Sequence, residues 1–391
     1  MKLGVVSLKL FYLTDGKYVT TGGFGRQMEA LASHFDEVVL CVPVARGTPV
    51  GAYRIESPNV SYCPLPPYRT QPQLLRAAPV MAWRILRNVG DWDIVNARLP
   101  DLTGWLGFAA ARLRKIPTFI SLTGDWEEVI LVRGETNARG AALWALRSYV
   151  RFYLALERFA VRRSLTFACG RALYEKYKGI APRIVMTVWT TVRESEIGEE
   201  RDTCANDVVR LLFVGRLTRA KGVSYLMEAL ASLRAEGRSV TLDVVGDGET
   251  RAELERQTAD LGLTSSVTMH GYKTLGDELI AHYRSADVFV LPSVSEGTPK
   301  VVLEAMSNAV PVVATNVGGL PTIVEPEETG LLVEPKSPAA LASAIARVID
   351  DGALRRRLIH GGLSFARTQT IERSTEALVS AVKAAHRTGT Q

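Results

Sequence analysis

Several residue patterns that mark other classes of protein are missing from this chain of 391 residues. It has 5 histidines, and no two of them lie four positions apart as in a helical zinc motif. It has 4 cysteines, and no pair has the C-x-x-C spacing of a redox or metal site. A disulfide framework is not expected in so large a chain, which favours a reducing, cytoplasmic location. The cysteines are Cys41, Cys63, Cys169 and Cys204.

Long apolar runs and a strong excess of one charge are also missing. No stretch is long and apolar enough to span a membrane. The start, M-K-L-G-V-V-S-L-K-L, is interrupted by Lys9 and lacks a small-residue cleavage site, so it predicts a first strand and not a signal peptide. The net charge of +6 suits anionic substrates or a membrane surface, but it is too weak to predict nucleic-acid binding.

Short apolar runs alternate with helix-length segments almost throughout the chain. Such alternation predicts an α/β fold with parallel sheets that helices cover on both faces. A single sheet would need roughly a dozen strands, which is near the upper limit, so two sheets in two domains are expected. The predicted strands are Leu3–Leu8, Val38–Pro43, Ile94–Ala97, Thr118–Leu122, Arg210–Val214, Thr241–Val245, Val267–His270, Val288–Leu291, Val310–Ala314 and Gly330–Val333.

A polar, aperiodic stretch at 192–208 separates the two halves, and a new buried strand begins directly after it. We therefore place a first domain at 1–195 and a second domain at 208–370. No internal repeat and no low-complexity segment is visible.

The most informative motif is L-P-S-V-S-E-G-T-P-K-V-V-L-E-A-M, at 291–306. A buried strand ends, and a helix is expected to begin with Thr298 as its N-cap and Pro299 as its first residue. The amides of Lys300 and Val301 would then form an anion site at the start of that helix.

Two glutamates frame this helix start. Glu304 lies about 9 Å along the helix, where it could accept both hydroxyls of a ribose whose diphosphate binds the amides. Glu296 lies in the loop before this helix, on the other side of the phosphate from the ribose, where a sugar could be. The alternative is that Glu304 is a solvated helix residue and Glu296 a charge in a loop.

Three further turns carry glycine or basic residues. Gly215 ends a strand, and Arg216 and Lys221 flank the loop after it, where they could hold phosphate oxygens. The alternative for this pair is solvated side chains. Gly246 and Gly248 either let backbone approach a ligand or simply form a tight turn.

The loop T-T-G-G-F-G-R-Q opens the first predicted helix and could direct amides at a ligand. It lacks the dinucleotide spacing, so an oxidoreductase is not predicted. Its glycines are Gly22, Gly23 and Gly25.

Two other segments have more than one interpretation. Asp91-Trp92-Asp93 mimics a metal-binding D-x-D motif, but it precedes a strand, far from any ligand edge, and is predicted to be a surface turn. The basic, aromatic segment 141–163 is predicted to be a helix that could rest on an anionic membrane. The alternative is a helix that packs its apolar face on its own domain.

Taken together, the motifs G-R-L-x(3)-K-G, G-D-G, V-F-V-L-P-S, E-x7-E and V-P-V-V-A-T-N-V-G-G-L-P-T-I-V resemble the retaining glycosyltransferases of family four. The resemblance implies the GT-B fold, two Rossmann-like domains with the nucleotide-sugar donor on the second. It also implies that a C-terminal helix at 371–388 completes the first domain. The segments V-N-A-R-L-P-D and S-L-T-G-D-W are similar to a branch that builds bacterial surface polysaccharides.

The resemblance assigns roles to matching residues. Arg216 and Lys221 hold the diphosphate, Glu304 binds the ribose and Glu296 contacts the donor sugar, while the amides from Gly297 onward hold phosphate or sugar. Many members have a histidine where this chain has Asp125, which is therefore our candidate on the acceptor side. Thr322 also replaces the usual glutamate of the G-G-x-P loop.

The expected activity is metal-independent, retaining transfer of a sugar from a nucleoside-diphosphate sugar to an acceptor hydroxyl, with no cofactor. The expected acceptor is a lipid-linked glycan or a polysaccharide intermediate, and the expected location is the cytoplasm or the inner face of the plasma membrane. The alternatives are a non-catalytic nucleotide-sugar-binding partner protein, a sugar-nucleotide epimerase and a phosphorylase.

Overall fold

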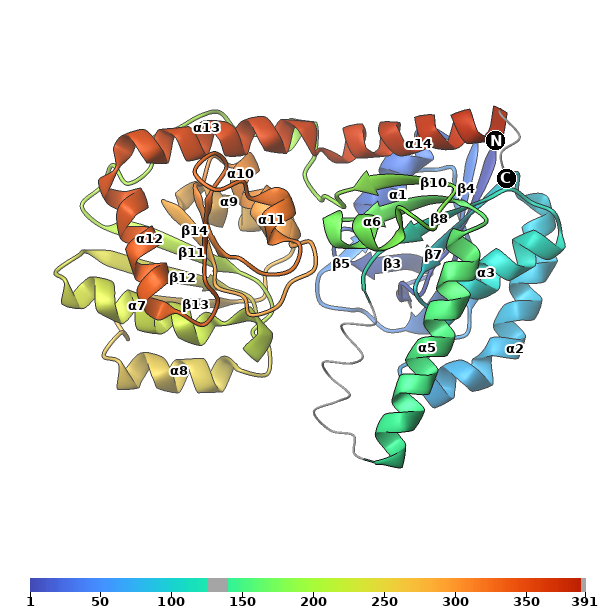
Figure 1. Ribbon diagram of the computed structural model, residues 1–391, viewed down its shortest axis with the longest axis horizontal. Helices are drawn as coiled ribbons and strands as arrows, with labels where there is room; N and C mark the ends of the chain where they lie inside the picture. The colour runs from blue at the N-terminus through green and yellow to red at the C-terminus, as the bar shows by residue number, and fades with distance from the viewer. Residues whose placement is uncertain (126–139, 388–391) are drawn as a thin grey trace. The chain divides into compact units, whose positions relative to one another are not determined.

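The computed structural model describes residues 1–125 and 140–387 and divides into two compact units. Unit 1 comprises Met1–Val188 and Ser374–Gln391, and unit 2 comprises Trp189–Arg373. The segment 192–208, where the sequence places the join, belongs to unit 2. Figure 1 shows the elements of each unit along the chain.

Unit 1 is built on a ten-stranded sheet of order β10-β9-β8-β7-β1-β4-β2-β3-β5, with β6 also paired to β4. The four strands predicted in this half are confirmed as β1, β4, β7 and β8, and they pair in parallel. The sheet is not wholly parallel as predicted, because β3 runs antiparallel to β2 and β5. These strands are short and partly exposed, so they lack the apolar runs by which buried strands are found. The strands are β1 (Lys2–Val6), β2 (Phe11–Thr14), β3 (Lys17–Thr21), β4 (Glu37–Arg46), β5 (Ala52–Arg54), β6 (Val60–Leu65), β7 (Ile94–Leu99), β8 (Thr118–Leu122), β9 (Leu165–Cys169) and β10 (Arg183–Thr187).

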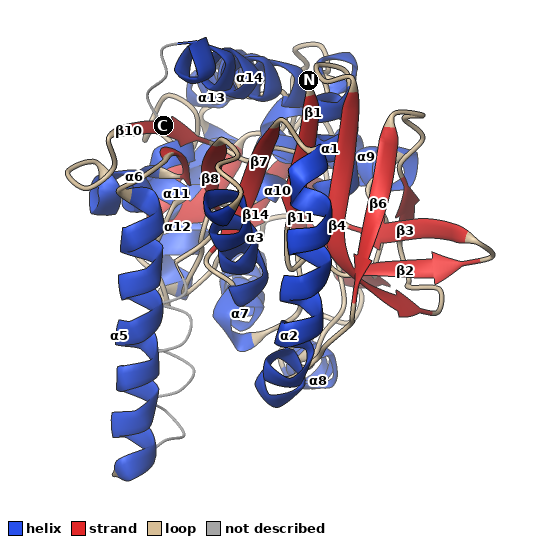
Figure 2. Cartoon of the chain, turned by 90° about the vertical axis from the view of Figure 1, so that its right-hand side faces the viewer, coloured by secondary structure: helices blue, strands red, loops and turns tan. Residues whose placement is uncertain are grey.

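Helices α2, α3 and α5 lie on one face of this sheet (Figure 2). Met81 and Ile85 of α2 are fully buried against the β4, β6 and β7 side of the core, and Ala160 and Val161 of α5 pack toward β8 and β9. The helices are α1 (Phe24–Ala32), α2 (Gln71–Asn88), α3 (Leu102–Leu113), α5 (Ala141–Val161) and α6 (Arg171–Tyr177), with a 3-10 turn η1 (Val89–Asp91).

Unit 2 contains a six-stranded sheet of order β13-β12-β11-β14-β15-β16, and every pairing in it is parallel. All six strands predicted in this half are confirmed. Figure 1 shows α7 and α8 on one face of the sheet and α9 and α10 on the other, as expected for a doubly wound fold. The strands are β11 (Val209–Val214), β12 (Val240–Val245), β13 (Val267–Gly271), β14 (Val288–Leu291), β15 (Val312–Thr315) and β16 (Leu331–Val333). The helices are α7 (Val223–Ala235), α8 (Arg251–Asp260), α9 (Asp277–Ser285), α10 (Lys300–Ser307), α11 (Leu320–Ile323), α12 (Pro338–Asp350) and α13 (Gly352–Thr368), with 3-10 turns η2 (Glu194–Glu196) and η3 (Arg219–Lys221). The last helix, α14 (Ile371–Arg387), only begins in this unit.

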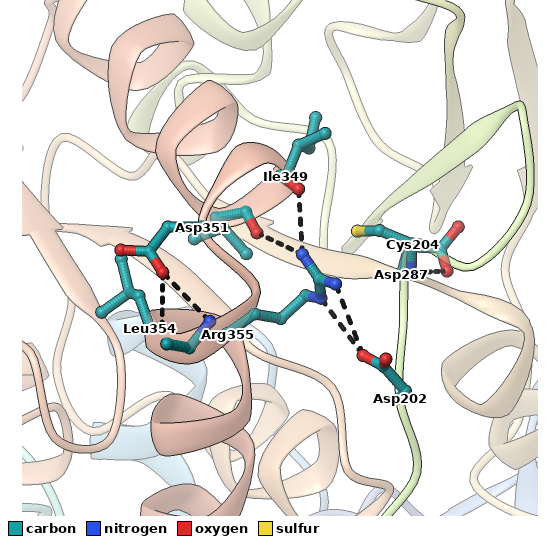
Figure 3. A network of polar contacts seen from close by, with 9 residues as sticks. Asp202, Cys204, Asp287, Ile349, Asp351, Leu354 and Arg355 are labelled. Carbon is teal, nitrogen blue, oxygen red and sulfur yellow. Dashed lines mark hydrogen bonds and ion pairs between the residues drawn. The ribbon is translucent and has the colours of Figure 1, made fainter.

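Partly buried polar contacts fix the chain just before β11, as Figure 3 shows. The Asp287 carboxylate accepts the amide hydrogens of Cys204 and Arg210 at 2.7 and 2.8 Å. The Arg355 guanidinium donates to the carbonyl of Ile349 at 2.9 Å and contacts Asp202 at 3.4 Å. The segment that lacks sequence periodicity is therefore held by side chains of unit 2.

Helix α14 begins in unit 2, and from Ser374 onward its residues group with unit 1. Its apolar side chains Leu378, Val379 and Val382 are buried. Among the described residues, no helix is both long enough and apolar enough to cross a membrane.

A buried carboxyl group lies at the start of α3 in unit 1. Asp101 is the N-cap of α3, and its carboxylate accepts the amide hydrogen of Gly104 at 2.9 Å. Burial raises the pKa of Asp101 from 3.8 to about 6, although the Gly104 bond opposes the shift. The folded state therefore holds a proton on this carboxyl at a pH where the unfolded chain has lost it.

Asp101→Asn tests this buried charge. An Asp with a raised pKa destabilises the fold as the pH rises from 4 to above 6, whereas Asn caps a helix equally well and does not titrate. The free energy of unfolding of the variant, minus that of the wild type, is expected to grow by about 2 kcal/mol between pH 4 and pH 7. Chemical denaturation across this pH range measures the difference.

Asp351→Asn is the matched control, because Asp351 caps α13 at an exposed site. The amides of Leu354 and Ala353 donate to its carboxylate and lower the pKa of that group. This variant should show the opposite sign. Parallel pH curves for Asp101→Asn and the wild type would contradict the prediction.

Candidate functional site

The motifs of the second half meet at the carboxyl edge of the unit 2 sheet. Strands β11, β12, β14 and β15 end there, and the loops that follow carry G-R-L-x(3)-K-G, G-D-G, E-x7-E and the G-G-L-P turn. Parallel α/β sheets bind their ligands at this edge.

Glycines let these loops pack backbone against backbone. A Cβ atom at Gly246 would lie 1.8 Å from the carbonyl oxygen of Gly215, and one at Gly248 would lie 2.2 Å from that of Leu217. Gly246 also has a positive φ of 139°. The close approach that the structure shows is to a neighbouring loop of the protein, and approach of this backbone to a ligand stays a prediction.

The same packing fixes the loop that precedes α10. A Cβ atom at Gly318 would lie 1.8 Å from the Glu296 carbonyl oxygen, and one at Gly319 would lie 2.1 Å from that of Gly297. The Gly319 amide donates to the Gly297 carbonyl at 2.9 Å. A third contact involves Gly222, whose Cβ would lie 2.1 Å from the Pro292 carbonyl oxygen.

Lys221 and Glu296 form an ion pair at the centre of these loops. The Lys221 Nζ lies 2.5 Å from Glu296 Oε1, and the Glu296 side chain is only 6% exposed. Ser293 donates from its hydroxyl to the same oxygen at 2.7 Å. Among the residues that the structure describes, no hydrogen bond reaches Oε2 of Glu296. The sequence alone gave Ser293 no role, since a lone serine in a loop carries no signal.

Arg216 follows Gly215 at the end of β11, and its side chain is exposed. An exposed guanidinium and a half-buried ammonium on one short loop provide two cationic groups at the edge of the sheet.

The start of α10 differs from the prediction. Helix α10 begins at Lys300 with Pro299 as its N-cap, and no side chain caps it. The predicted cap by Thr298 is wrong by one position, because Pro299 has an extended ψ of 114° and so stands outside the helix. Lys300 and Val301 remain the first two helical residues, where backbone amides have no partner one turn earlier in the helix.

Glu304 is the fifth residue of α10 and is buried with a relative exposure of 9%. Thr191 donates to Oε1 at 2.6 Å, and Tyr283 donates to Oε2 at 2.9 Å. The alternative of a solvated helix residue is therefore wrong. The carboxylate still has lone pairs for further donors, because each oxygen has two acceptor sites. Thr191 and Tyr283 were not identified from the sequence, since they lie far from Glu304 in the chain.

The glycine loop of unit 1 leads into α1, as predicted. Gly23 is the N-cap of α1, and Gly22 has a positive φ of 66°. A Cβ atom at Gly25 would lie 2.3 Å from the ring of Tyr53. Gly25 is therefore required by packing within unit 1.

Asp125 follows β8 at the carboxyl edge of the unit 1 sheet and lines a pocket there. Both of its carboxylate oxygens accept from Lys176 Nζ, at 3.0 and 2.8 Å. An acceptor hydroxyl that used Asp125 as a base would have to compete with this ion pair.

The D-x-D segment lies at the amino end of β7, opposite the ligand edge. Trp92, which lies between the two aspartates in the sequence, is buried. Asp93 accepts the amide hydrogen of Lys2 at 2.6 Å. In the part of the chain that the structure describes, no three His, Cys, Asp or Glu residues are grouped to hold a metal ion.

Two known families match the chain. Residues 201–364 match the family described as "Glycosyl transferases group 1", and residues 23–175 match the "Glycosyl transferase 4-like domain". The D-inositol 3-phosphate glycosyltransferase 1 of Catenulispora acidiphila is 33% identical over 300 residues, which cover 72% of this chain and 70% of that one. The chain belongs to the group 1 glycosyltransferases.

Other curated relatives match over shorter regions. An uncharacterized glycosyltransferase of Methanocaldococcus jannaschii is 39% identical over 155 residues, which cover 40% of this chain and 39% of that one. The chain spans about two fifths of the length of this relative and of several others that it matches.

Solved GT-B structures match over nearly the whole chain and confirm the predicted fold class. Anabaena HepE in complex with UDP has a TM-score of 0.73 at 18% identity, with 98% of this chain and 100% of that chain covered. Sucrose-phosphate synthase from Thermosynechococcus elongatus has a TM-score of 0.73 at 21% identity, with 99% and 100% covered.

Gly248→Ala tests the packing of the loops. The new methyl group would overlap the Leu217 carbonyl, so we expect the free energy of unfolding of unit 2 to fall by about 1–3 kcal/mol. Gly352→Ala is the matched control, because a Cβ there meets only the ends of arginine side chains at 3.5 Å. Urea denaturation measures both. Equal stability of the two variants would show that the loops move apart without cost.

Proposed function

We propose that the protein is a retaining glycosyltransferase that needs no metal and transfers a sugar from a nucleoside-diphosphate sugar to an acceptor hydroxyl. The observation that carries this proposal is the Lys221–Glu296 ion pair, with Arg216 and the start of α10 on the same set of loops, which glycine contacts hold together. Family membership supports the same chemistry.

The diphosphate gains negative charge as the bond from sugar to phosphate breaks. Arg216 and Lys221 provide positive charge for that leaving group, and the first amides of α10 provide hydrogen-bond donors. These groups are in place before the reaction, so little reorganisation is needed when charge develops.

The two glutamates bind different parts of the donor in this proposal. The described residues donate to Oε1 of Glu296 and none of them donates to Oε2. In this proposal Oε2 accepts hydrogen bonds from hydroxyls of the transferred sugar. Glu304 accepts hydrogen bonds from the ribose, and the Thr191 and Tyr283 hydroxyls hold its carboxylate in position.

The acceptor must lose a proton as the new glycosidic bond forms. Asp125 is occupied by Lys176, so we assign this proton to the leaving diphosphate, on the same face of the sugar. Proton transfer on that face is consistent with retention of configuration at the anomeric carbon.

The acceptor class rests on the N-terminal motifs that resemble polysaccharide-building enzymes, and a lipid-linked glycan or polysaccharide intermediate is the expected acceptor. The Streptomyces kanamyceticus relative called 2-deoxystreptamine glucosyltransferase is 40% identical over 141 residues, which favours transfer over epimerisation or phosphorolysis.

Arg216→Ala and Lys221→Ala test the leaving-group assignment. Loss of one stabilising group is expected to cost about 3 kcal/mol of barrier, or roughly a hundredfold in turnover. Nucleotide release from a panel of UDP-, GDP-, ADP- and dTDP-sugars, with and without acceptor, gives the rates.

Arg219→Ala is the control, because Arg219 lies on the same turn with its side chain 84% exposed. It should retain activity, as should the wild type in excess EDTA. Unchanged turnover in both site variants would overturn the assignment, and donor binding without any transfer would favour a non-catalytic partner.

Helix α5 also presents an apolar and basic face. Trp144 and Phe152 are 73% and 61% exposed, while Val150 and Ala160 are buried on another side of the helix. The buried side confirms the alternative that the helix packs an apolar face on its own domain, and membrane contact stays a prediction. We propose that the exposed face rests on anionic lipids at the inner face of the plasma membrane. Its basic residues, all exposed, are Arg147, Arg151, Arg158, Arg162 and Arg163.

The variant Trp144→Ala/Phe152→Ala tests membrane contact. It removes exposed rings, so binding to vesicles with anionic lipid at low salt should fall at least several-fold with no loss of thermal stability. Tyr272→Ala, which removes a 49% exposed ring from unit 2, is the control. Sedimentation measures binding, and a wild type that does not bind would end the membrane proposal.

A further inference from the structure

Unit 1 contains a pocket that the donor site of unit 2 does not use. The space in it that protein atoms leave unfilled, open solvent included, is about 640 Å³. Leu8 lines it just after β1, Pro100 and Leu102 just after β7, and Asp125 just after β8. The pocket therefore lies at the carboxyl edge of parallel strands, where α/β sheets bind ligands.

The walls of this pocket are largely apolar and aromatic. Helix α5 contributes Tyr149, Val150, Tyr153 and Leu154, a spacing that places all four on one face of the helix. The ring centroids of Tyr149 and Tyr153 are 4.8 Å apart, and α2 contributes Leu74 to the wall. Such walls suit a hydrocarbon chain or a flat ring.

The charged groups of the lining are all acidic. Asp101, Asp125 and Glu157 line the pocket, and no lysine or arginine is among its lining residues in the described chain. Each carboxyl has a partner outside the pocket lining, since Asp101 binds the Gly104 amide, Asp125 binds Lys176 and Glu157 accepts from the Tyr177 hydroxyl. The carboxyl oxygens can accept hydrogen bonds from hydroxyl groups. Lys176 pairs with Asp125 and the charge of Arg98 acts on Asp101, but neither cation lines the pocket, so a phosphate inside it would meet the carboxylates first.

We propose that this pocket binds an uncharged, apolar group of the acceptor, attached to the part that bears the accepting hydroxyl, and that it excludes phosphate. The proposal rests on the proposed function and names the acceptor class at the unit 1 side of that reaction. A phosphate on the acceptor must then lie outside the pocket.

Calorimetric titration with four probes tests this specificity without any turnover. The probes are octyl β-D-glucoside below its micelle concentration, 4-nitrophenyl β-D-glucoside, glucose and glucose 6-phosphate. At least one glycoside with an apolar group should bind tenfold or more tightly than glucose, and glucose 6-phosphate should bind no more tightly than glucose. Preference for the octyl compound identifies a chain, and preference for the nitrophenyl compound identifies a ring.

Two variants place the binding in the pocket. Leu8→Trp fills it from a partly exposed position, and Leu154→Trp fills it from α5. Each should weaken glycoside binding at least tenfold. Leu156→Trp is the control, because Leu156 is half-buried on the same helix and does not line the pocket.

The outcomes separate this proposal from the proposed function, because UDP, GDP, ADP and dTDP are titrated on the same preparations. If at least one nucleotide binds, the pocket assignment alone would be overturned by no preference for the apolar glycosides, by tighter binding of glucose 6-phosphate, or by full glycoside affinity in both tryptophan variants. A wild type that binds none of the four nucleotides would instead count against the donor site. Thermal melting of each variant confirms that it is folded.

Discussion

Backbone packs directly on backbone where the loops of unit 2 leave the sheet, and the proposed donor site depends on that contact. At Gly222, Gly246, Gly248 and Gly318, a carbonyl oxygen of another loop occupies the position that a side chain would take, and the Gly222 contact joins the loop after β11 to the loop after β14. The loops that carry Arg216 and Glu296 therefore share one rigid framework. Rigid loops of this kind are what pre-organised electrostatic stabilisation requires, since donors that must first move lose their advantage.

Both glutamates of the site are buried, and the protein compensates them differently. Glu296 has a cation and a hydroxyl on one oxygen, whereas Glu304 has a neutral hydroxyl on each of its oxygens. A buried ion pair contributes little net stability, because desolvation offsets the attraction. The Lys221–Glu296 pair is better understood as holding two functional groups in place than as strengthening the fold.

The sequence was informative where a signal is local. Apolar runs predicted the parallel strands, and the motifs placed Lys221 and Glu296 in loops that follow predicted strands. Contacts between distant segments gave no signal, which is why the Thr191 bond to Glu304 and the pocket beside Asp125 were missed. The cap at Thr298 failed for another reason, because the ψ of Pro299 depends on how its loop packs and not on its residue type.

Unit 1 is discontinuous in the chain, because its first 188 residues are joined by the segment from Ser374 onward. The ribosome therefore synthesises all of unit 2 before the final element of unit 1 emerges. Until then, the surface that Val382 and Ala385 cover near β7, β8 and β9 stays open to water. On the nascent chain this apolar surface is exposed from the time its strands are made until α14 emerges. A chaperone can bind it during that period.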